Sequence, residues 1–405
     1  MMVVSRPNVL LVLFDSLSES ACVHLQDRLP TLSGLRAKNH CFTNSYACSP
    51  ESGPARASLF TGLDMAAHGV WTDGVPLPEC ETTVPQVFQR NGYHTWLVGR
   101  RQLAGVSHWT TEHARLDEYH HFDWAHGPLH RSRQNAYLEW LQHAAPGSFA
   151  EIFPEQADPD NTGIAPEQRQ AMARLPDDLS FNTWVGMQTC KRIAEETAAP
   201  FFGIASFVVG NTGGARRAEN PGFDILDKRA LVQADAALST IMNYVAPDTI
   251  VVFTAGRGSG MQSQDLLNVP LVIRVPERPA QVTEGIVSSM EVAPTLYELA
   301  SITTPERIQG QSLLTMPPRG WALARLRHPD GPPQTTLCSA RWKMVMIQQT
   351  DTTLFQLYDL ATDPQARNDL AGDPLHTDDL ERMIDLMIDA RVALEDRTTP
   401  RIAAF

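Results

Sequence analysis

The sequence predicts an α/β fold with three layers, α/β/α, around a central mixed and mostly parallel sheet. Two observations support this class. Short apolar runs typical of buried strands alternate with amphipathic stretches typical of covering helices. Polar residues directly follow two of the runs, which is where such sheets carry ligands. The predicted strands span residues 9–14, 94–98, 201–209, 249–254 and 271–275, and the predicted helices span residues 83–92, 180–198 and 225–245.

The first predicted strand lies close to the N-terminus. Its apolar run, residues 9–14, is too short to cross a membrane. No small-residue cleavage site typical of a signal peptide accompanies it. We therefore interpret the run as a buried parallel strand that ends on Asp15. The expectation is a cytoplasmic protein that begins near Met1 and does not interact with membranes.

Residues 105–175 show no strand signal and are predicted to form a long insertion or lid. Their histidines have two interpretations, a new metal site or a polar lid. The histidine spacing matches no ordinary zinc pattern, which favours the lid, although Glu118 and Asp123 lie nearby. Later in the insertion, Asp158, Asp160 and Asn161 resemble part of a calcium loop. They lack its final glutamate, so we interpret them as a turn. The clustered histidines are His108, His113, His120, His121, His126 and His130.

The C-terminal part has a different character. A Pro-rich stretch precedes residues 336–360, which predict two or three antiparallel strands, and an amphipathic helix is predicted over 375–395. This pattern indicates a small α+β subdomain. The predicted division is a large α/β/α domain over residues 1–317 and the subdomain over 318–405.

Composition excludes some functions. The formal net charge is −13, which argues against a nucleic-acid-binding protein but leaves room for a local cationic pocket. The six cysteines form no Cys-x-x-Cys pair. This usage is typical of reduced thiols in a cytosolic protein and favours neither a disulfide framework nor a zinc site.

Four long motifs carry a resemblance to a known family. They are "RPNVLLVLFDS" at 6–16, the block from "LPTLSG" to "AAHGV" at 29–70, "TTVPQVFQRNGYHTWLVGR" at 82–100 and "TIVVFTAGRG" at 249–258. Together they resemble the sulfatase family of the alkaline phosphatase superfamily, which includes arylsulfatases and phosphonate monoester hydrolases. The likeness runs nearly from end to end and implies the α/β/α fold of that family. A homodimer would be compatible with this fold.

The resemblance also implies a nucleophile position. In the family, a Cys or Ser followed by x-Pro-x-Arg is oxidised to formylglycine, whose hydrate attacks a sulfate ester held by calcium. An ungapped count from "FTN" at 42–44 places Ser52 in this position and Arg56 at the motif arginine. Cys48 lacks an arginine at that offset and is expected to be a small buried residue. Ser49 is expected to act only in a turn.

The chain departs from the family at the positions that carry the chemistry. Asp15-Ser16 stands in place of an acidic pair, and Gly256-Arg257 in place of Asp followed by His or Asn. The Lys-x-His motif appears as Arg100-Arg101-Gln102, and the Pro-His-x-Pro motif as residues 210–213, Gly-Asn-Thr-Gly. Calcium prefers about 6–8 oxygen ligands, and of the metal-binding positions only Asp15 keeps a carboxylate. We expect no cofactor, and calcium or magnesium only if other residues rebuild the site.

Three residues each have a functional and a structural interpretation. Ser52 is a formylglycine precursor, a plain nucleophile or a helix N-cap, and the missing base favours the cap. Arg56 either binds an anion or pairs with Asp15, and the two roles are compatible. Arg257 either replaces calcium by pairing with Asp15 and holding an anion, or points to solvent. With Arg56, Arg100 and Asn211, it would make a cationic pocket for a sulfate, phosphate or carboxylate group.

Three functions are compatible with these positions. The first is a sulfatase homologue that has lost hydrolysis that depends on formylglycine and calcium, and acts as a pseudoenzyme, an anion-binding protein or a metal-independent enzyme. The second is an active hydrolase or transferase of sulfate, phosphate or phosphonate esters, with Ser52 as nucleophile and Arg56 and Arg100 assisting. The third is a structural or partner-binding role for a sulfatase shell.

Overall fold

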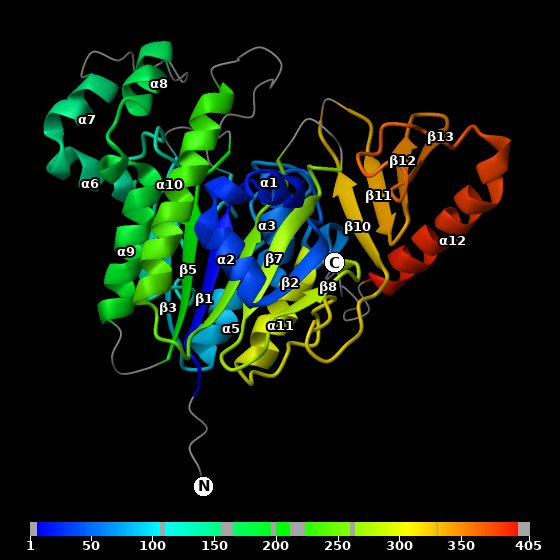
Figure 1. Cartoon of the computed structure of the whole chain (residues 1–405), viewed down its shortest axis with the longest axis horizontal. Coiled ribbons are helices and arrows are strands. Elements are labelled where there is room, and N and C mark those ends of the chain that lie inside the picture. The colour runs from blue at the N-terminus through cyan, green and yellow to red at the C-terminus, as the bar shows by residue number, and fades with distance from the viewer. Residues whose placement is uncertain are drawn as a thin grey trace, which may run out of the picture.

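The computed structural model describes residues 6–105, 110–154, 165–195, 200–210, 223–259, 264–329 and 331–395. A large sheet forms the centre of the main domain, and helices cover both of its faces (Figure 1). The strand order is β4-β3-β5-β1-β6-β7-β2-β8, with β9 paired to β2. The sheet is mixed and mostly parallel because β7 alone runs antiparallel to its neighbours β6 and β2. The predicted fold class is confirmed.

The five predicted strands are present with small shifts at their ends. They are β1 (Val9–Phe14), β3 (His94–Gly99), β5 (Phe201–Phe207), β6 (Ile250–Ala255) and β7 (Asn268–Arg274). The other strands of the sheet are β2 (His40–Tyr46), β4 (His121–Trp124), β8 (Gln281–Thr283) and β9 (Val287–Ser288). The three predicted helices are α5 (Val84–Arg90), α9 (Phe181–Glu195) and α10 (Phe223–Tyr244).

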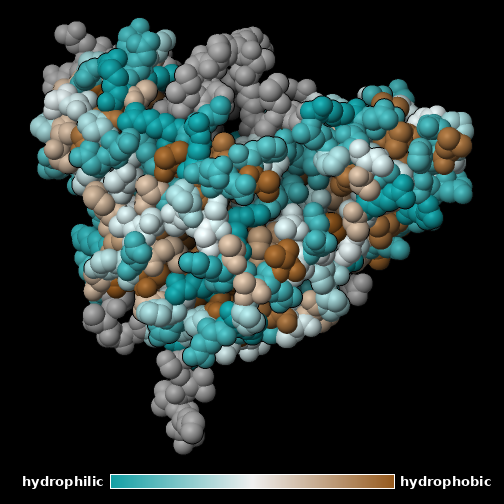
Figure 2. All heavy atoms as spheres, viewed as in Figure 1, coloured by the Kyte–Doolittle hydropathy of each residue, from teal (hydrophilic) through white to brown (hydrophobic). Residues whose placement is uncertain are grey.

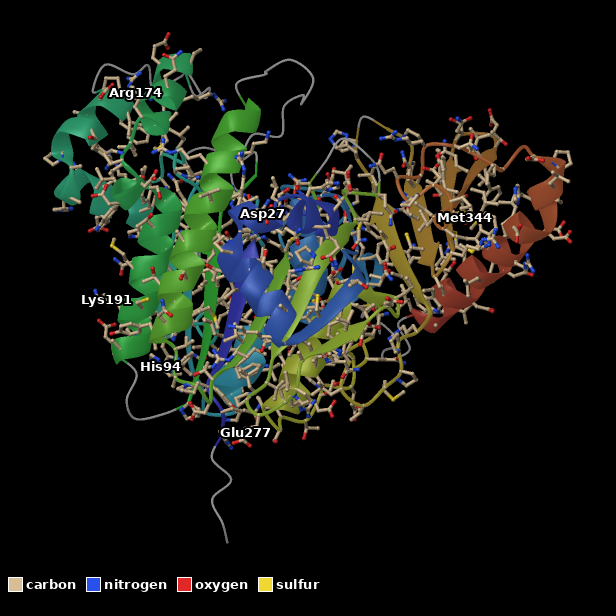
Figure 3. All side chains as sticks on the ribbon, viewed as in Figure 1. Asp27, His94, Arg174, Lys191, Glu277 and Met344 are labelled. Atoms are coloured by element: carbon tan, nitrogen blue, oxygen red, sulfur yellow. The ribbon has the colours of Figure 1, made fainter. Side chains whose placement is uncertain are left out.

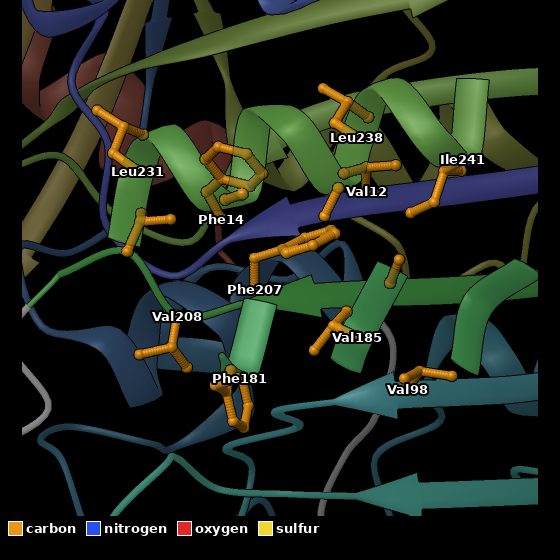
Figure 4. Close-up of a cluster of buried hydrophobic side chains, with 14 of the residues drawn as sticks. Val12, Phe14, Val98, Phe181, Val185, Phe207, Val208, Leu231, Leu238 and Ile241 are labelled. Atoms are coloured by element: carbon orange, nitrogen blue, oxygen red, sulfur yellow. The ribbon is translucent and has the colours of Figure 1, made fainter. Parts of the chain in front are cut away.

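The two faces of β1 pack against different layers because successive strand residues point to opposite sides. Val12 and Phe14 belong to the cluster that includes α9 and α10 (Figure 4). Val9, Leu11 and Leu13 belong to a second cluster with α3 (Ser52–Thr61), α5 and α11 (Val292–Leu299). A strand buried on both faces reads as a continuous apolar run, which is why β1 could be predicted.

The expectation that residues 105–175 lack a strand is wrong. β4 lies in this segment and adds to the edge of the sheet in parallel with β3. The strand is short and begins with a histidine, so its sequence gave no apolar run. The segment also contains α6 (Ala136–Ala144), α7 (Pro146–Ile152) and α8 (Pro166–Ala173), whereas Asp158, Asp160 and Asn161 lie outside the described residues.

The C-terminal subdomain has one more strand than predicted. Its antiparallel sheet contains β10 (Trp321–Leu326), β11 (Gln334–Ser339), β12 (Trp342–Gln348) and β13 (Thr353–Asp359), and α12 (Thr377–Ala393) packs against it. Met344 of β12 lies on the side of the sheet that packs on α12 (Figure 3). The boundary between residues 317 and 318 stays a prediction.

The remaining helical segments are short and lie in the main domain or before the last helix. They are α1 (Glu19–His24), α2 (Pro30–Lys38) and α4 (Met65–His68), with 3-10 turns at Gln26–Arg28, Asp177–Leu179, Ser289–Glu291 and Pro374–His376.

The visible surface is mostly hydrophilic, and its hydrophobic residues occur singly or in small groups (Figure 2). Among the described residues, no helix is both long and apolar enough to cross a membrane.

A glycine in the centre of the sheet provides a packing test. A Cβ at Gly203 of β5 would lie 2.1 Å from Cζ2 of the buried Trp96. We expect Gly203→Ala to lower the free energy of unfolding by about 3 kcal/mol, because the ring must shift in a packed core. Gly34→Ala is the matched control, since its Cβ would meet nothing within 4 Å and Ala favours helix α2 by roughly 0.5–1 kcal/mol. Chemical denaturation of both variants measures the difference, and equal stabilities would contradict this packing.

Candidate anion-binding site

The candidate site lies at the carboxyl ends of the central strands. Asp15 follows β1, Arg100 follows β3, Gly210 lies three residues after β5, and Gly256 and Arg257 follow β6. Because β1, β3, β5 and β6 are parallel, their carboxyl ends meet at one edge of the sheet. Ser52 starts α3, and its hydrogen bond to Arg257 brings it to the same edge.

Asp15 is the buried carboxylate at the centre of this edge. Its Oδ1 accepts hydrogen bonds from the backbone N–H groups of Val209 at 2.8 Å and Gly210 at 3.1 Å. Its Oδ2 forms an ion pair with Nη1 of Arg100 at 3.1 Å, and both side chains are almost completely buried. Asp15 therefore already accepts three N–H donors. The hypothesis that Arg56 or Arg257 pairs with Asp15 is wrong, because Arg100 forms the ion pair with this carboxylate, and the guanidiniums of Arg56 and Arg257 donate to carbonyl and hydroxyl oxygens instead.

Arg56 has a fully buried guanidinium that is only partly satisfied. Its exposed fraction is 0%. Nη1 donates to the carbonyl oxygens of Arg100 at 2.8 Å and Arg101 at 3.3 Å, and to Oγ of Ser206 at 3.1 Å. Nε and Nη2 have no hydrogen-bond partner in the part of the chain that the structure describes. Burial, and then the neighbouring charge of Arg100, lower the pKa of Arg56 to about 10, so the group stays charged at neutral pH.

Arg257 is directed to the nucleophile position. Its Nε donates to Oγ of Ser52 at 2.9 Å, and its Nη1 donates to the carbonyl oxygen of Gly258 at 3.1 Å. The interpretation of Ser52 as the N-cap of its helix is wrong by one residue, because α3 begins at Ser52 and Glu51 is the N-cap. Ser52 is only 8% exposed, and its hydroxyl accepts a hydrogen bond from Arg257.

Two carboxylates near Ser52 were not selected from the sequence. Oδ1 of Asp73 accepts the backbone N–H of Gly53 at 2.6 Å, and Oε2 of Glu51 accepts the backbone N–H of Asp73 at 3.1 Å. Burial raises the pKa of Glu51. Neither contact is encoded by spacing, because the two segments are some twenty residues apart and meet only in the folded chain.

The other candidate residues have structural surroundings. Ser16 donates to the carbonyl oxygen of Gly258 at 3.1 Å. Cys48 lies in the cluster that joins the main domain to the subdomain, and burial raises the pKa of its thiol. Ser49 accepts the backbone N–H of Glu51, which matches its predicted turn role. Asn211 lies outside the described residues.

The described histidine rings of the 105–130 segment do not form a shared site, although the backbone carbonyl oxygen of His126 accepts Nε of Arg100. His108 lies outside the described residues. The rings of His120 and His121 pack near His94, which begins β3 at the opposite edge of the sheet (Figure 3). Glu118 is paired with Arg101, and Asp123 with Arg192. Within the described ranges, no group of three or more His, Cys, Asp or Glu side chains has the geometry to hold a metal ion.

The described residues do not fit the calcium ion that the resemblance implies. Asp15 is the only carboxylate at the old metal positions, and its oxygens already accept N–H donors. Gly256 supplies no ligand, and a Cβ at this position would lie 3.3 Å from Nε of Arg56. Calcium binding requires several oxygen ligands, and the adjacent guanidinium groups repel a cation. The arrangement favours an anion over a metal ion.

Comparisons with known proteins agree with the fold and the motifs. Residues 7–141 match the sulfatase family model, and residues 261–320 match the model described as N-sulphoglucosamine sulphohydrolase, C-terminal. The sulfatase YidJ of Escherichia coli K12 is 24% identical over 446 residues, covering 96% of this chain and 88% of the relative. The N-acetylglucosamine-6-O-sulfatase of Bacteroides thetaiotaomicron is 20% identical over 487 residues, covering 96% of this chain and 87% of the relative.

Solved structures share the same architecture. The phosphonate monoester hydrolase of Agrobacterium radiobacter superposes with a TM-score of 0.76 at 19% identity and covers 97% of both chains. The phosphonate monoester hydrolase of Silicibacter pomeroyi has a TM-score of 0.74 at 19% identity, covering 97% of this chain and 96% of that one.

The buried ion pair at this site gives a stability prediction. We expect Arg100→Met to lower the free energy of unfolding by about 3–5 kcal/mol, because Asp15 would remain charged and buried without its partner. Arg90→Met is the matched control, since the Arg90–Asp117 pair is exposed and such pairs contribute roughly 0–1 kcal/mol. Urea denaturation at neutral pH checks both values. A small loss in Arg100→Met would show that Asp15 does not depend on this arginine.

Proposed function

Since this chain belongs to the sulfatase family of the alkaline phosphatase superfamily, we propose that its site binds a small oxyanion through arginines, without calcium. In this proposal the chain has lost hydrolysis that depends on formylglycine and calcium. The ligand is a sulfate, phosphate or carboxylate group. The observation that supports this proposal most directly concerns Arg56, whose Nε and Nη2 are buried and have no hydrogen-bond partner among the described residues.

The geometry of these two donors supports an anion with at least two oxygens. Nε and Nη2 lie on the same side of a guanidinium, and together they form a fork that fits two oxygens of one group. A buried N–H group without a partner is costly, so a ligand that satisfies both donors gains more than it would at an exposed arginine. Arg56, Arg100 and Arg257 bring three positive charges, Asp15 neutralises one of them, and the carboxylates of Asp73 and Glu51 lie near Ser52.

The positions that differ from the family motif support the loss of the family reaction. Gly256 and Arg257 stand where the motif has a metal-binding acid and its partner, and Gln102 stands where it has a histidine. Among the described residues, the hydrogen-bond partner of Ser52 Oγ is Arg257, and it makes no hydrogen bond to a histidine or a carboxylate. A serine hydroxyl without a base or metal is a weak nucleophile.

The second candidate is an ester hydrolase or transferase that uses unmodified Ser52. The Arg257–Ser52 hydrogen bond favours it, because a guanidinium would stabilise negative charge that develops on the hydroxyl oxygen. Attack of Oγ on sulfur or phosphorus would form a sulfo- or phosphoserine and release an alcohol. Turnover then needs a base that removes a proton from water or another hydroxyl, whose oxygen attacks the sulfur or phosphorus and releases the serine.

Anion binding is tested by thermal unfolding in sodium sulfate, phosphate and acetate, with sodium chloride at matched ionic strength. We expect a saturable rise in Tm with at least one oxyanion, in EDTA as well as in calcium. A ligand at about 100 times its Kd stabilises a protein by about 2.7 kcal/mol. The absence of a saturable shift would contradict anion binding, and a shift that requires calcium would contradict the metal-free site.

Arg257→Gln is the matched site variant in the same titration. Hydrogen bonds to charged groups contribute about 1.5–3 kcal/mol, so we expect roughly ten- to hundredfold weaker oxyanion binding. Arg278→Gln is its control, because this arginine follows β7 next to Glu277 at the opposite edge of the sheet (Figure 3). Equal affinities in the two variants would remove Arg257 from the site.

The modification state of Ser52 tests the loss of the family reaction, and turnover that depends on Ser52 separates the two candidates. We expect intact-mass analysis to show an unmodified serine and aryl sulfates to show no turnover above that of Ser52→Ala. Conversion of Ser52 to formylglycine would lower the mass by two hydrogen atoms. That mass change would contradict the loss of formylglycine-dependent chemistry, and turnover abolished in Ser52→Ala would establish catalysis; either result would overturn the proposal.

A further inference from the structure

The backbone that follows β3 adopts a strained turn at Gln102. Its φ is 59°, a left-handed conformation that is uncommon for residues other than glycine. Its side-chain Oε1 is buried without a hydrogen-bond partner in the described structure. Such positions persist only where surrounding contacts hold them, and they concentrate at functional sites. The turn lies two residues after Arg100, so its conformation affects the candidate site directly.

Glu112 holds this turn from the 110–125 segment. Its Oε2 accepts the backbone N–H of Gln102 at 2.9 Å, and its Oε1 accepts the backbone N–H of Leu103 at 2.7 Å. The same carboxylate pairs with Nη1 of Arg101 at 3.1 Å and accepts Nε1 of Trp124 at 3.2 Å. Glu112 is 1% exposed. One buried carboxylate therefore fixes two successive backbone N–H groups and the arginine before them.

The conformation of this turn also sets the orientation of Arg56. It points the Arg100 side chain to Asp15 and the Arg101 side chain away from the site, toward Glu112 and Glu118. The carbonyl oxygens of residues 100 and 101 are left to accept Nη1 of Arg56. With Nη1 anchored, the fork of Nε and Nη2 keeps one direction. The orientation of the anion-binding fork therefore depends on the backbone that Glu112 holds.

We propose that Glu112 is a positioning residue of the anion site, which acts by holding the turn at Gln102 that anchors Arg56. This inference rests on the proposed function for its affinity readout. It assigns a role to the segment after β3. This segment supports the arginines of the site and does not itself contact the ligand.

Glu118 provides a matched control, which separates the proposed positioning role of Glu112 from a merely structural one. It is also fully buried and pairs with Arg101 through Nη2 at 2.7 Å and Nε at 3.2 Å. Its Oε2 also accepts the backbone N–H of Arg115 at 3.2 Å and its Oε1 accepts Oγ1 of Thr83 at 3.0 Å, but its side chain makes no hydrogen bond to residues 102 or 103. Glu112→Gln and Glu118→Gln both remove a buried charge beside Arg101. Only Glu112→Gln places an amide N–H against the N–H donors of the turn.

The experiment measures sulfate affinity by calorimetry for the wild type, Glu112→Gln, Glu118→Gln and the double variant Glu112→Gln/Gln102→Gly. We expect both single variants to lower Tm, but only Glu112→Gln to weaken sulfate binding, by about tenfold. The double variant should recover most of the affinity, because glycine adopts the left-handed conformation without the Cβ penalty. Equal affinity losses in the two single variants, or no rescue, would overturn the proposal.

A second readout does not require anion binding. Crystal structures of Glu112→Gln and Glu118→Gln should differ at the turn, with Arg56 rotated away from the carbonyl oxygens of residues 100 and 101 only in Glu112→Gln. An unmoved Arg56 in Glu112→Gln would reject the positioning role. If the wild type binds no sulfate, phosphate or acetate, the proposed function fails, while the crystal structures still decide the role of Glu112.

Discussion

The ion pair between Asp15 and Arg100 is the interaction on which the carboxyl edge of the sheet depends. Three arginines meet there, and Asp15 is the carboxylate that pairs with one of them. Arg100 forms an ion pair with that carboxylate, because β3 and β1 flank β5 and their carboxyl ends lie at nearly the same level along the strand direction. Arg56 and Arg257 must then find carbonyl and hydroxyl oxygens. The result is an excess of positive charge inside a chain whose overall charge is negative.

This excess distinguishes the site from one built around a metal ion. A divalent cation attracts carboxylates, and its site is recognised by several oxygen ligands that converge on one point. Here the carboxylate of Asp15 already accepts hydrogen bonds from the backbone N–H groups of residues 209 and 210 and from the guanidinium of Arg100. At Gly256, the missing side chain leaves Arg56 close to the backbone. Both features place donors where a metal site would need acceptors.

The segment after β3 connects the variable part of the chain to this edge. It contributes β4 to the sheet and two buried glutamates that enclose Arg101. Removing a glutamate here would leave a buried arginine partly unpaired, so charge balance ties the segment to the site. A region that sequence reasoning treated as a lid is in this part an internal support.

The sequence by itself determined the layers of the fold, the five main strands and the position of Ser52 at the start of a helix. Short continuous apolar runs bounded by turn residues are typical of buried strands, and the Ser-x-Pro-x-Arg spacing is local. It missed β2, β8 and β9 of the main sheet, β4, whose four residues begin with His121, and β10, which follows a Pro-rich stretch. Only the tertiary structure decided which arginine meets Asp15, which one meets Ser52, and that Glu112 holds the turn at Gln102. These contacts join segments far apart in the chain, and hydrogen-bond geometry between them has no counterpart in spacing or composition.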